Sequence, residues 1–186
     1  MILRGLWLLA RGRDTGLREF ADGLDGFTAS LAPLIAFPLV GAGVSALGGD
    51  WQLAIIAFLS RVSVVLALPL IIHEYARRTG REALWLRTAT ALDWSFWLLM
   101  PLLFIAAFAG AALVEAGVAM QNAEYAALGF IVGYQIWLHW FVVRAGLQMK
   151  ALAAAALVLV SGAVALLLTA APFALNYAFT GQMMPG

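Results

Sequence analysis

Long apolar segments, divided by short polar ones, run through most of the chain. Five of them hold about 20 residues each, the length at which an α-helix crosses the hydrocarbon core of a bilayer. They cover residues 27–47, 51–72, 94–114, 125–143 and 151–172. The turn-forming residues Gly48, Gly49 and Asp50 separate the first two segments. The pattern predicts an all-α fold, a polytopic membrane bundle of five transmembrane helices.

The basic residues alternate with these spans. Ten of the eleven lie before the first span, in the second loop or in the fourth loop: Arg4, Arg11, Arg13, Arg18, Arg77, Arg78, Arg81, Arg87, Arg144 and Lys150. Basic residues collect on the cytoplasmic side of membrane proteins. We therefore expect a protein of the bacterial inner membrane. It has a cytoplasmic segment over residues 1–26, a transmembrane domain over 27–176 and a short outside tail over 177–186.

The segment before the first span is amphipathic. Apolar residues recur at helical spacing, first at Ile2, Leu6 and Leu9 and again at Leu17, Phe20, Ala21 and Leu24. We predict two short helices lying on the cytoplasmic face of the membrane. The alternative is a cap that packs on the inner end of the bundle.

The second loop is the longest polar stretch between spans. Gly80 is expected to break it, and Leu84, Trp85 and Leu86 predict a further amphipathic helix at the interface. Four arginines in this region are candidates for binding anionic lipid headgroups: Arg77, Arg78, Arg81 and Arg87.

Composition narrows the class of protein. Hydrophobic residues make up 64% of the 186 residues, charged residues only 11%, and the net charge is +1. The mean hydropathy is +0.94. A soluble domain averages about 45–50% apolar residues, so a bilayer is the expected solvent. The small net charge argues against nucleic acid as a partner, and a sequence without cysteine has no disulfide or cysteine metal site.

Arg61 is the eleventh basic residue, and it lies within the apolar run from Ala57 to Pro69. It follows Trp51 by ten residues, which places it about 15 Å along the second span, near the middle of the membrane. Intramembrane cations usually face the bundle interior and have a polar partner. Two interpretations stay open. Arg61 binds an anionic ligand or marks a polar pathway, or it is held by polar neighbours and fixes helix packing.

The expected partners of Arg61 lie on the fourth span. Gln135 and His139 are four residues apart and so share a helical face. Asp93 begins the third span at its cytoplasmic end. We predict a polar cluster of Arg61, Gln135 and His139 with Asp93 at its mouth, which helps binding or packing.

Small residues and prolines mark two further positions. Gly129 and Gly133 form a small-xxx-small face on the fourth span, which suits close helix packing within the protomer or between two copies. Pro33 and Pro38 lie five residues apart in the first span and predict a kinked or broken helix.

The sequence contains no recognisable catalytic motif. The stretch "HEYAR", beginning at His73, resembles the start of a zinc-protease motif, but that motif requires a second histidine where this chain has Arg77. His73 and His139 are a weaker candidate pair, as axial ligands of a haem. We expect no metal, no cofactor and no enzymatic activity.

Two stretches carry a family resemblance. "FTASLAPLIAFPLVG" in the first span and "REALWLRTATALDWSFWLLMPLL" at the third are similar to the corresponding parts of bacterial Yip-like proteins, which also have five spans. The resemblance implies a helical membrane protein that organises membranes or partners. The partners would be the lipid bilayer, other membrane proteins or a second copy. The alternative function is transport of a small solute or ion through the Arg61 cluster.

Overall fold

The structure, a computed structural model, describes residues 2–49 and 51–180. All regular elements in these residues are helical. In chain order they are α1 (Ile2–Ala10), the 3₁₀ helix η1 (Asp14–Glu19), α2 (Leu24–Leu47), α3 (Trp51–Arg78), α4 (Glu82–Ser95), the 3₁₀ turn η2 (Phe96–Leu98), α5 (Leu99–Glu115), α6 (Met120–Gly146) and α7 (Ala151–Thr180). Within the described residues, five helical segments are long and apolar enough to cross a membrane, with α4, η2 and α5 forming one of them. The all-α fold and the expected number of long apolar helices are confirmed.

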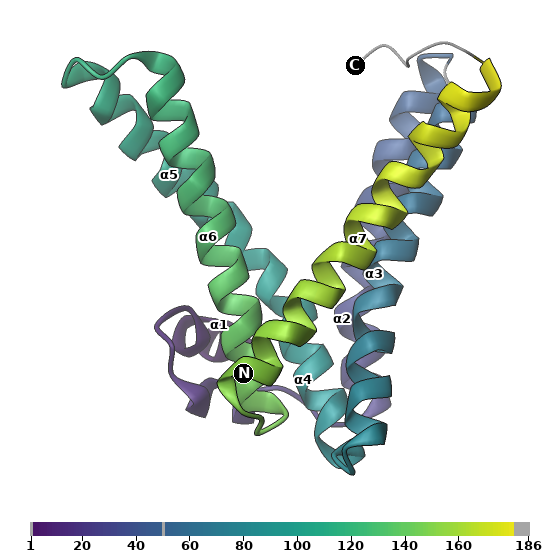
Figure 1. The fold of residues 1–186 in the computed structure, drawn as a ribbon, viewed down its shortest axis with the longest axis vertical. Coiled ribbons are helices and arrows are strands. Elements are labelled where there is room, and N and C mark those ends of the chain that lie inside the picture. The colour runs from purple at the N-terminus through teal and green to yellow at the C-terminus, as the bar shows by residue number, and fades with distance from the viewer. Residues whose placement is uncertain (1, 50, 181–186) are drawn as a thin grey trace.

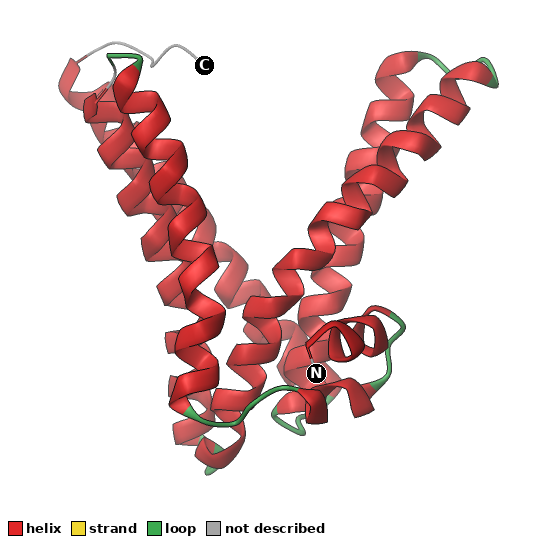
Figure 2. Cartoon of the chain, turned by 180° about the vertical axis from the view of Figure 1, so that it is seen from behind, coloured by secondary structure: helices red, strands yellow, loops and turns green. Residues whose placement is uncertain are grey.

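The helices form a V with one closed and one open end (Figure 1). One arm consists of α2, α3 and α7, and the other consists of α5 and α6. Seen from behind, the two arms again diverge from a common base (Figure 2). The base contains α1, η1 and α4 together with the ends of α3 and α6 and the start of α7. The described chain starts at this closed end, and α7 finishes at the open end.

The main hydrophobic core lies in the base. Its buried members come from six elements and from the loops after η1 and α6: Leu6, Leu9, Leu17, Phe20, Ile72, Ala76, Ala91, Leu92, Leu138, Val142, Val143, Leu147, Met149, Ala154 and Leu157. Few apolar residues are buried in the arms, and Ala54, Leu102, Ala106 and Ala123 are among them. The base therefore fixes the directions in which the arms leave it.

The amino-terminal segment packs on the bundle and does not stand apart from it. Leu6 and Leu9 of α1 and Phe20 after η1 are buried in the core of the base. The hydroxyl of Tyr134 on α6 donates a hydrogen bond of 2.9 Å to the carbonyl of Ala10. Of the two arrangements the sequence leaves open, the structure has the cap on the bundle end. The second short helix is a 3₁₀ helix.

The second loop is much shorter than predicted. α3 continues to Arg78, Gly80 turns the chain with a φ of 68°, and α4 begins at Glu82. The amphipathic interfacial helix expected around Trp85 is instead the first part of the third long helix. Its central residues, from Thr88 to Asp93, are buried. The hydroxyls of Thr88 and Thr90 bond to carbonyls one turn back, which lets this polar helix be buried.

Prolines lie inside the long helices without ending them. α2 is one continuous helix through Pro33 and Pro38, so the first span is not broken, and the kink at these prolines stays a prediction. α7 continues past Pro172 to Thr180. The predicted tail, 177–186, therefore begins inside a helix, and residues 181–186 of it lie outside the described part of the chain.

Candidate functional site

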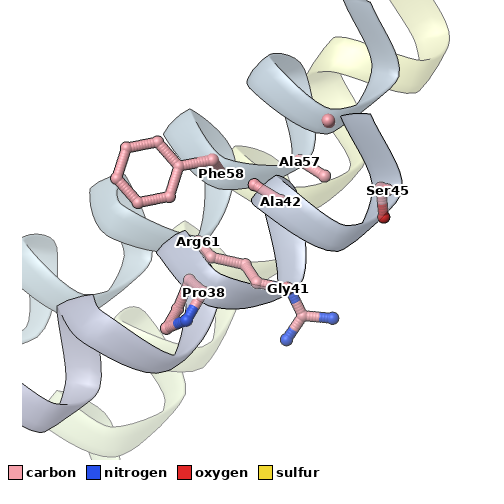
Figure 3. A pocket seen from close by; sticks show the side chains of 8 residues that line it. Pro38, Gly41, Ala42, Ser45, Ala57, Phe58 and Arg61 are labelled. Atoms are coloured by element: carbon pink, nitrogen blue, oxygen red, sulfur yellow. The ribbon is translucent and has the colours of Figure 1, made fainter. Parts of the chain in front are cut away.

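Arg61 lies on α3 and faces α2. Its side chain lines a cavity of about 220 Å³ between these two helices (Figure 3). The other lining residues are Pro38, Gly41, Ala42 and Ser45 of α2 and Ala54, Ala57 and Phe58 of α3. The wall is formed mostly by small or apolar side chains. Within the described residues, no ion pair or hydrogen bond involves the Arg61 guanidinium.

The helical period shows which way this stretch of α3 faces. Arg61, Leu68 and Ile72 lie on one face, because seven and eleven residues are close to whole numbers of turns at about 3.6 residues per turn. Ile72 is fully buried in the base, and Leu68 packs against that core. Arg61 lies on the same face of α3 as these two residues but beyond the end of the core, and it is exposed.

The predicted cluster of Arg61 with Gln135 and His139 is not assembled. Arg61 belongs to the arm of α2, α3 and α7, whereas Gln135 and His139 lie on α6, which leaves the base with α5 (Figure 1). The His139 ring packs edge-on against Phe96, with 5.9 Å between the ring centroids. The side-chain nitrogen of Gln135 is buried without a hydrogen-bond partner among the described residues.

Asp93 lies in the base and bonds to the first long helix. The Ser30 hydroxyl is 2.9 Å from a carboxyl oxygen of Asp93, and both residues are only 1% exposed. The same hydroxyl is 2.7 Å from the carbonyl of Phe27. Asp93 thus connects α4 to α2, a contact between residues 63 positions apart in sequence. Its position favours a structural role over that of a gate beside Arg61.

Three of the four arginines expected at lipid headgroups have partners within the chain. Arg77 and Arg78 both pair with Glu74, at 2.8 and 2.6 Å. Arg87 pairs with Asp22, which holds the segment between η1 and α2 against α4. Arg81 precedes α4, and its amide donates to the carbonyl of Ala76. Only the Arg87–Asp22 pair joins two parts of the base, since the pairs of Arg77 and Arg78 lie within α3 and are exposed.

The remaining sequence candidates lie apart from these contacts. A Cβ added at Gly129 or Gly133 would meet nothing within 4 Å, so this small-residue face is unpacked within the described chain. The two histidines considered as a ligand pair have different aromatic neighbours. His73 packs on Trp85, with ring centroids 4.7 Å apart, whereas His139 packs on Phe96. Among the described residues, no group of three or more histidine, aspartate or glutamate side chains is arranged to hold a metal.

The sequence interpretation missed one polar contact between helices. The Ser60 hydroxyl donates a hydrogen bond of 2.8 Å to the carbonyl of Leu168, which connects α3 to α7. The sequence feature that could have indicated this contact is Pro172, four residues after Leu168. Proline has no amide hydrogen, so it leaves the carbonyl four positions earlier without its usual helical donor.

Comparisons with protein-family models, with curated proteins and with solved structures found no match. The functional argument therefore depends on the geometry of the chain itself.

Proposed function

We propose that this chain is a non-catalytic integral membrane protein that organises other components of a bacterial inner membrane. In this proposal the base lies at the cytoplasmic face and the arms open toward the outside. Ten of the eleven basic residues belong to segments of the base or to its loops, and basic residues favour the cytoplasmic side. The amino terminus is then inside and the carboxy terminus outside.

The observation that carries the proposal is the division between a packed base and two sparsely packed arms. Large apolar side chains are exposed along both arms, among them Leu59, Leu70, Phe104, Phe108, Leu128 and Leu166. Lipid tails are as apolar as these side chains, so exposure alone does not pull the arms together in a bilayer. The arms can therefore present helical surfaces to a second membrane component while the base keeps its shape.

The Yip-like resemblance supports the same kind of role. Five spans and the absence of a recognisable catalytic motif in the sequence agree with a protein that acts by binding neighbours. We propose lipid, other membrane proteins or a second copy as those neighbours. The unpacked Gly129–Gly133 face on α6 is a surface on which helices approach closely.

Photo-crosslinking in native membranes tests this proposal. Leu128 lies seven residues before Gln135 and fourteen before the buried Val142, so it shares the core-facing stripe of α6. Phe130 is exposed on a different face of α6 and serves as the matched control. A photoreactive residue at 128 should give a discrete protein adduct, and one at 130 should give mainly lipid adducts. Lipid adducts alone from both positions would count against an organising role.

One observation favours transport as a second candidate function. Arg61 lies near the middle of a span without a counter-charge among the described residues, and intramembrane cations often mark solute pathways. Under this function Arg61→Ala abolishes solute flux in proteoliposomes while the protein stays folded. If the wild type shows no flux and Arg61→Ala only lowers thermal stability and abundance, Arg61 is a structural residue.

A further inference from the structure

Arg61 is a membrane-embedded cation without a counter-charge inside the described chain. It is ten residues from the start of α3 at Trp51, a rise of about 15 Å along the helix. The segment from Ala54 to Arg78 is one of the five candidate spans. A charge at such depth is unfavourable unless a partner or water surrounds it. Some other group is therefore expected next to the guanidinium.

A second copy of the chain is a poor source of that group. Asp93 is buried in the base beside Ser30. The other described acids lie in the base or close to a helix end: Asp14, Glu19, Asp22, Asp25, Glu74, Glu82, Glu115 and Glu124. A copy inserted in the same orientation brings none of them to the depth of Arg61. A different molecule is therefore the remaining source of a counter-charge at this depth.

The cavity beside Arg61 indicates the kind of molecule. It holds about 220 Å³, and its lining along α3 runs from Arg61 through Ala57 to Ala54, a rise of about 10 Å toward the open end. Apart from the guanidinium, the Ser45 hydroxyl is the one polar side chain in this lining (Figure 3). The site therefore has a cationic end and an apolar wall.

We propose that this cavity binds a small amphiphilic carboxylate, of the medium-chain fatty-acid class. The carboxylate pairs with Arg61, and the hydrocarbon chain lies along the alanines of α2 and α3. A guanidinium matches a carboxylate through two parallel hydrogen bonds, and one negative charge neutralises one positive charge. A phosphate dianion leaves an excess negative charge in the membrane. A phospholipid headgroup stays near the surface, about 15 Å away.

This site does not depend on the organising role or on transport. An amphiphile can occupy the cavity whether or not the arms recruit a partner, and binding is measured without any flux. The outcome of the binding experiment is therefore independent of the photo-crosslinking result.

Equilibrium binding of radiolabelled octanoate to the full chain in zwitterionic nanodiscs tests the proposal, with empty nanodiscs subtracted. We expect saturable binding that unlabelled octanoate displaces. Arg61→Gln should weaken binding about tenfold or more, since hydrogen bonds to charged groups contribute about 1.5–3 kcal/mol. Arg77→Gln is the matched control, because Arg77 pairs with Glu74 away from the cavity, and it should leave the affinity unchanged.

Further measurements separate the contribution of the charge pairing from that of the apolar wall. Ala57→Leu keeps Arg61 but fills the cavity, and it should also weaken octanoate binding, which keeps the proposal testable if Arg61→Gln does not fold. Neither 1-octanol nor acetate should compete as well as octanoate. Equal competition by 1-octanol would overturn the charge pairing, and equal competition by acetate would overturn the apolar part. Unchanged binding in both variants would overturn the site.

Discussion

The Ser60 hydroxyl on α3 replaces the hydrogen bond that Pro172 removes from α7. It donates to the carbonyl of Leu168 at 2.8 Å, and Ser60 is only 7% exposed. In a regular helix that carbonyl accepts from the amide of residue 172, which here has no hydrogen. An unpaired carbonyl is costly in a bilayer, where water does not reach it. Ser60 thus compensates for a proline in the neighbouring helix.

This relationship predicts that two substitutions are coupled. Ser60→Ala should lower the free energy of unfolding by about 1 kcal/mol, the typical scale for polar contacts between membrane helices. In a Pro172→Ala background the loss should shrink, because the alanine amide can donate to Leu168. Unfolding of all four proteins in bicelles measures the coupling. Equal losses in both backgrounds would show that Ser60 does not compensate for Pro172.

The buried pair of Asp93 and Ser30 should also behave as a unit. Ser30→Ala removes the hydroxyl beside the carboxyl group and should cost about 1–3 kcal/mol of stability. In an Asp93→Ala background the same change should cost much less, because no carboxyl group is left without a partner. Asp93→Asn keeps an acceptor oxygen and should be the mildest variant at position 93. Additive losses in the double-mutant cycle would contradict this coupling.

Two glycines of α6 should respond oppositely to alanine. A Cβ at Gly146 would lie 2.7 Å from the methyl carbon of Thr88, which is fully buried in α4. Gly146→Ala should therefore destabilise the base by about 1–3 kcal/mol. Gly133→Ala meets nothing within 4 Å and should stabilise the helix by up to about 1 kcal/mol. Thermal unfolding compares the two, and a Gly146→Ala protein as stable as wild type would show that α4 and α6 pack less closely.

Tyr134 should hold the amino-terminal cap in place. Tyr134→Phe removes the hydrogen bond to the Ala10 carbonyl, a loss of about 0.5–1.5 kcal/mol. Amide exchange in α1 should then become several-fold faster, with little change in the arms. Tyr125→Phe is the control, since the Tyr125 hydroxyl interacts with Gln121 near the open end. Equal exchange in α1 for both variants would mean that the hydroxyl does not anchor the cap.

Much of the fold can be predicted because the relevant signals are local. Five apolar segments predict five long helices, and the glycines at 48–49 and at 80 mark turns that the structure has. The apolar pattern places the start of the third long helix twelve residues too late, because Arg87, Thr88, Thr90 and Asp93 make α4 look polar. The hydroxyls of its threonines donate hydrogen bonds to carbonyls of the same helix. The burial of α4 depends on tertiary contacts, which hydropathy does not show.

The candidate site was harder to predict because it depends on which helices are neighbours. The depth of Arg61 follows from counting residues, but its neighbour, α2, depends on how the arms diverge. Gln135 and His139 share a helical face as expected, yet that helix lies in the other arm. The bond between Ser60 and Leu168 has a local signal in Pro172, whereas the choice of Ser60 as the donor requires the packing of α3 on α7.

The central claim is that the base holds the two arms apart in a bilayer. The sequence has no cysteine, so spin labels can be introduced at chosen positions, here Leu47 at the end of α2 and Met120 at the start of α6. Exposed base residues Arg13 and Gln148 provide the control pair. Pulsed electron–electron double resonance in nanodiscs should give one long distance between spin labels at positions 47 and 120, which matches separated arms. A short distance there, with the base pair unchanged, would mean that the arms close on each other and would contradict the account.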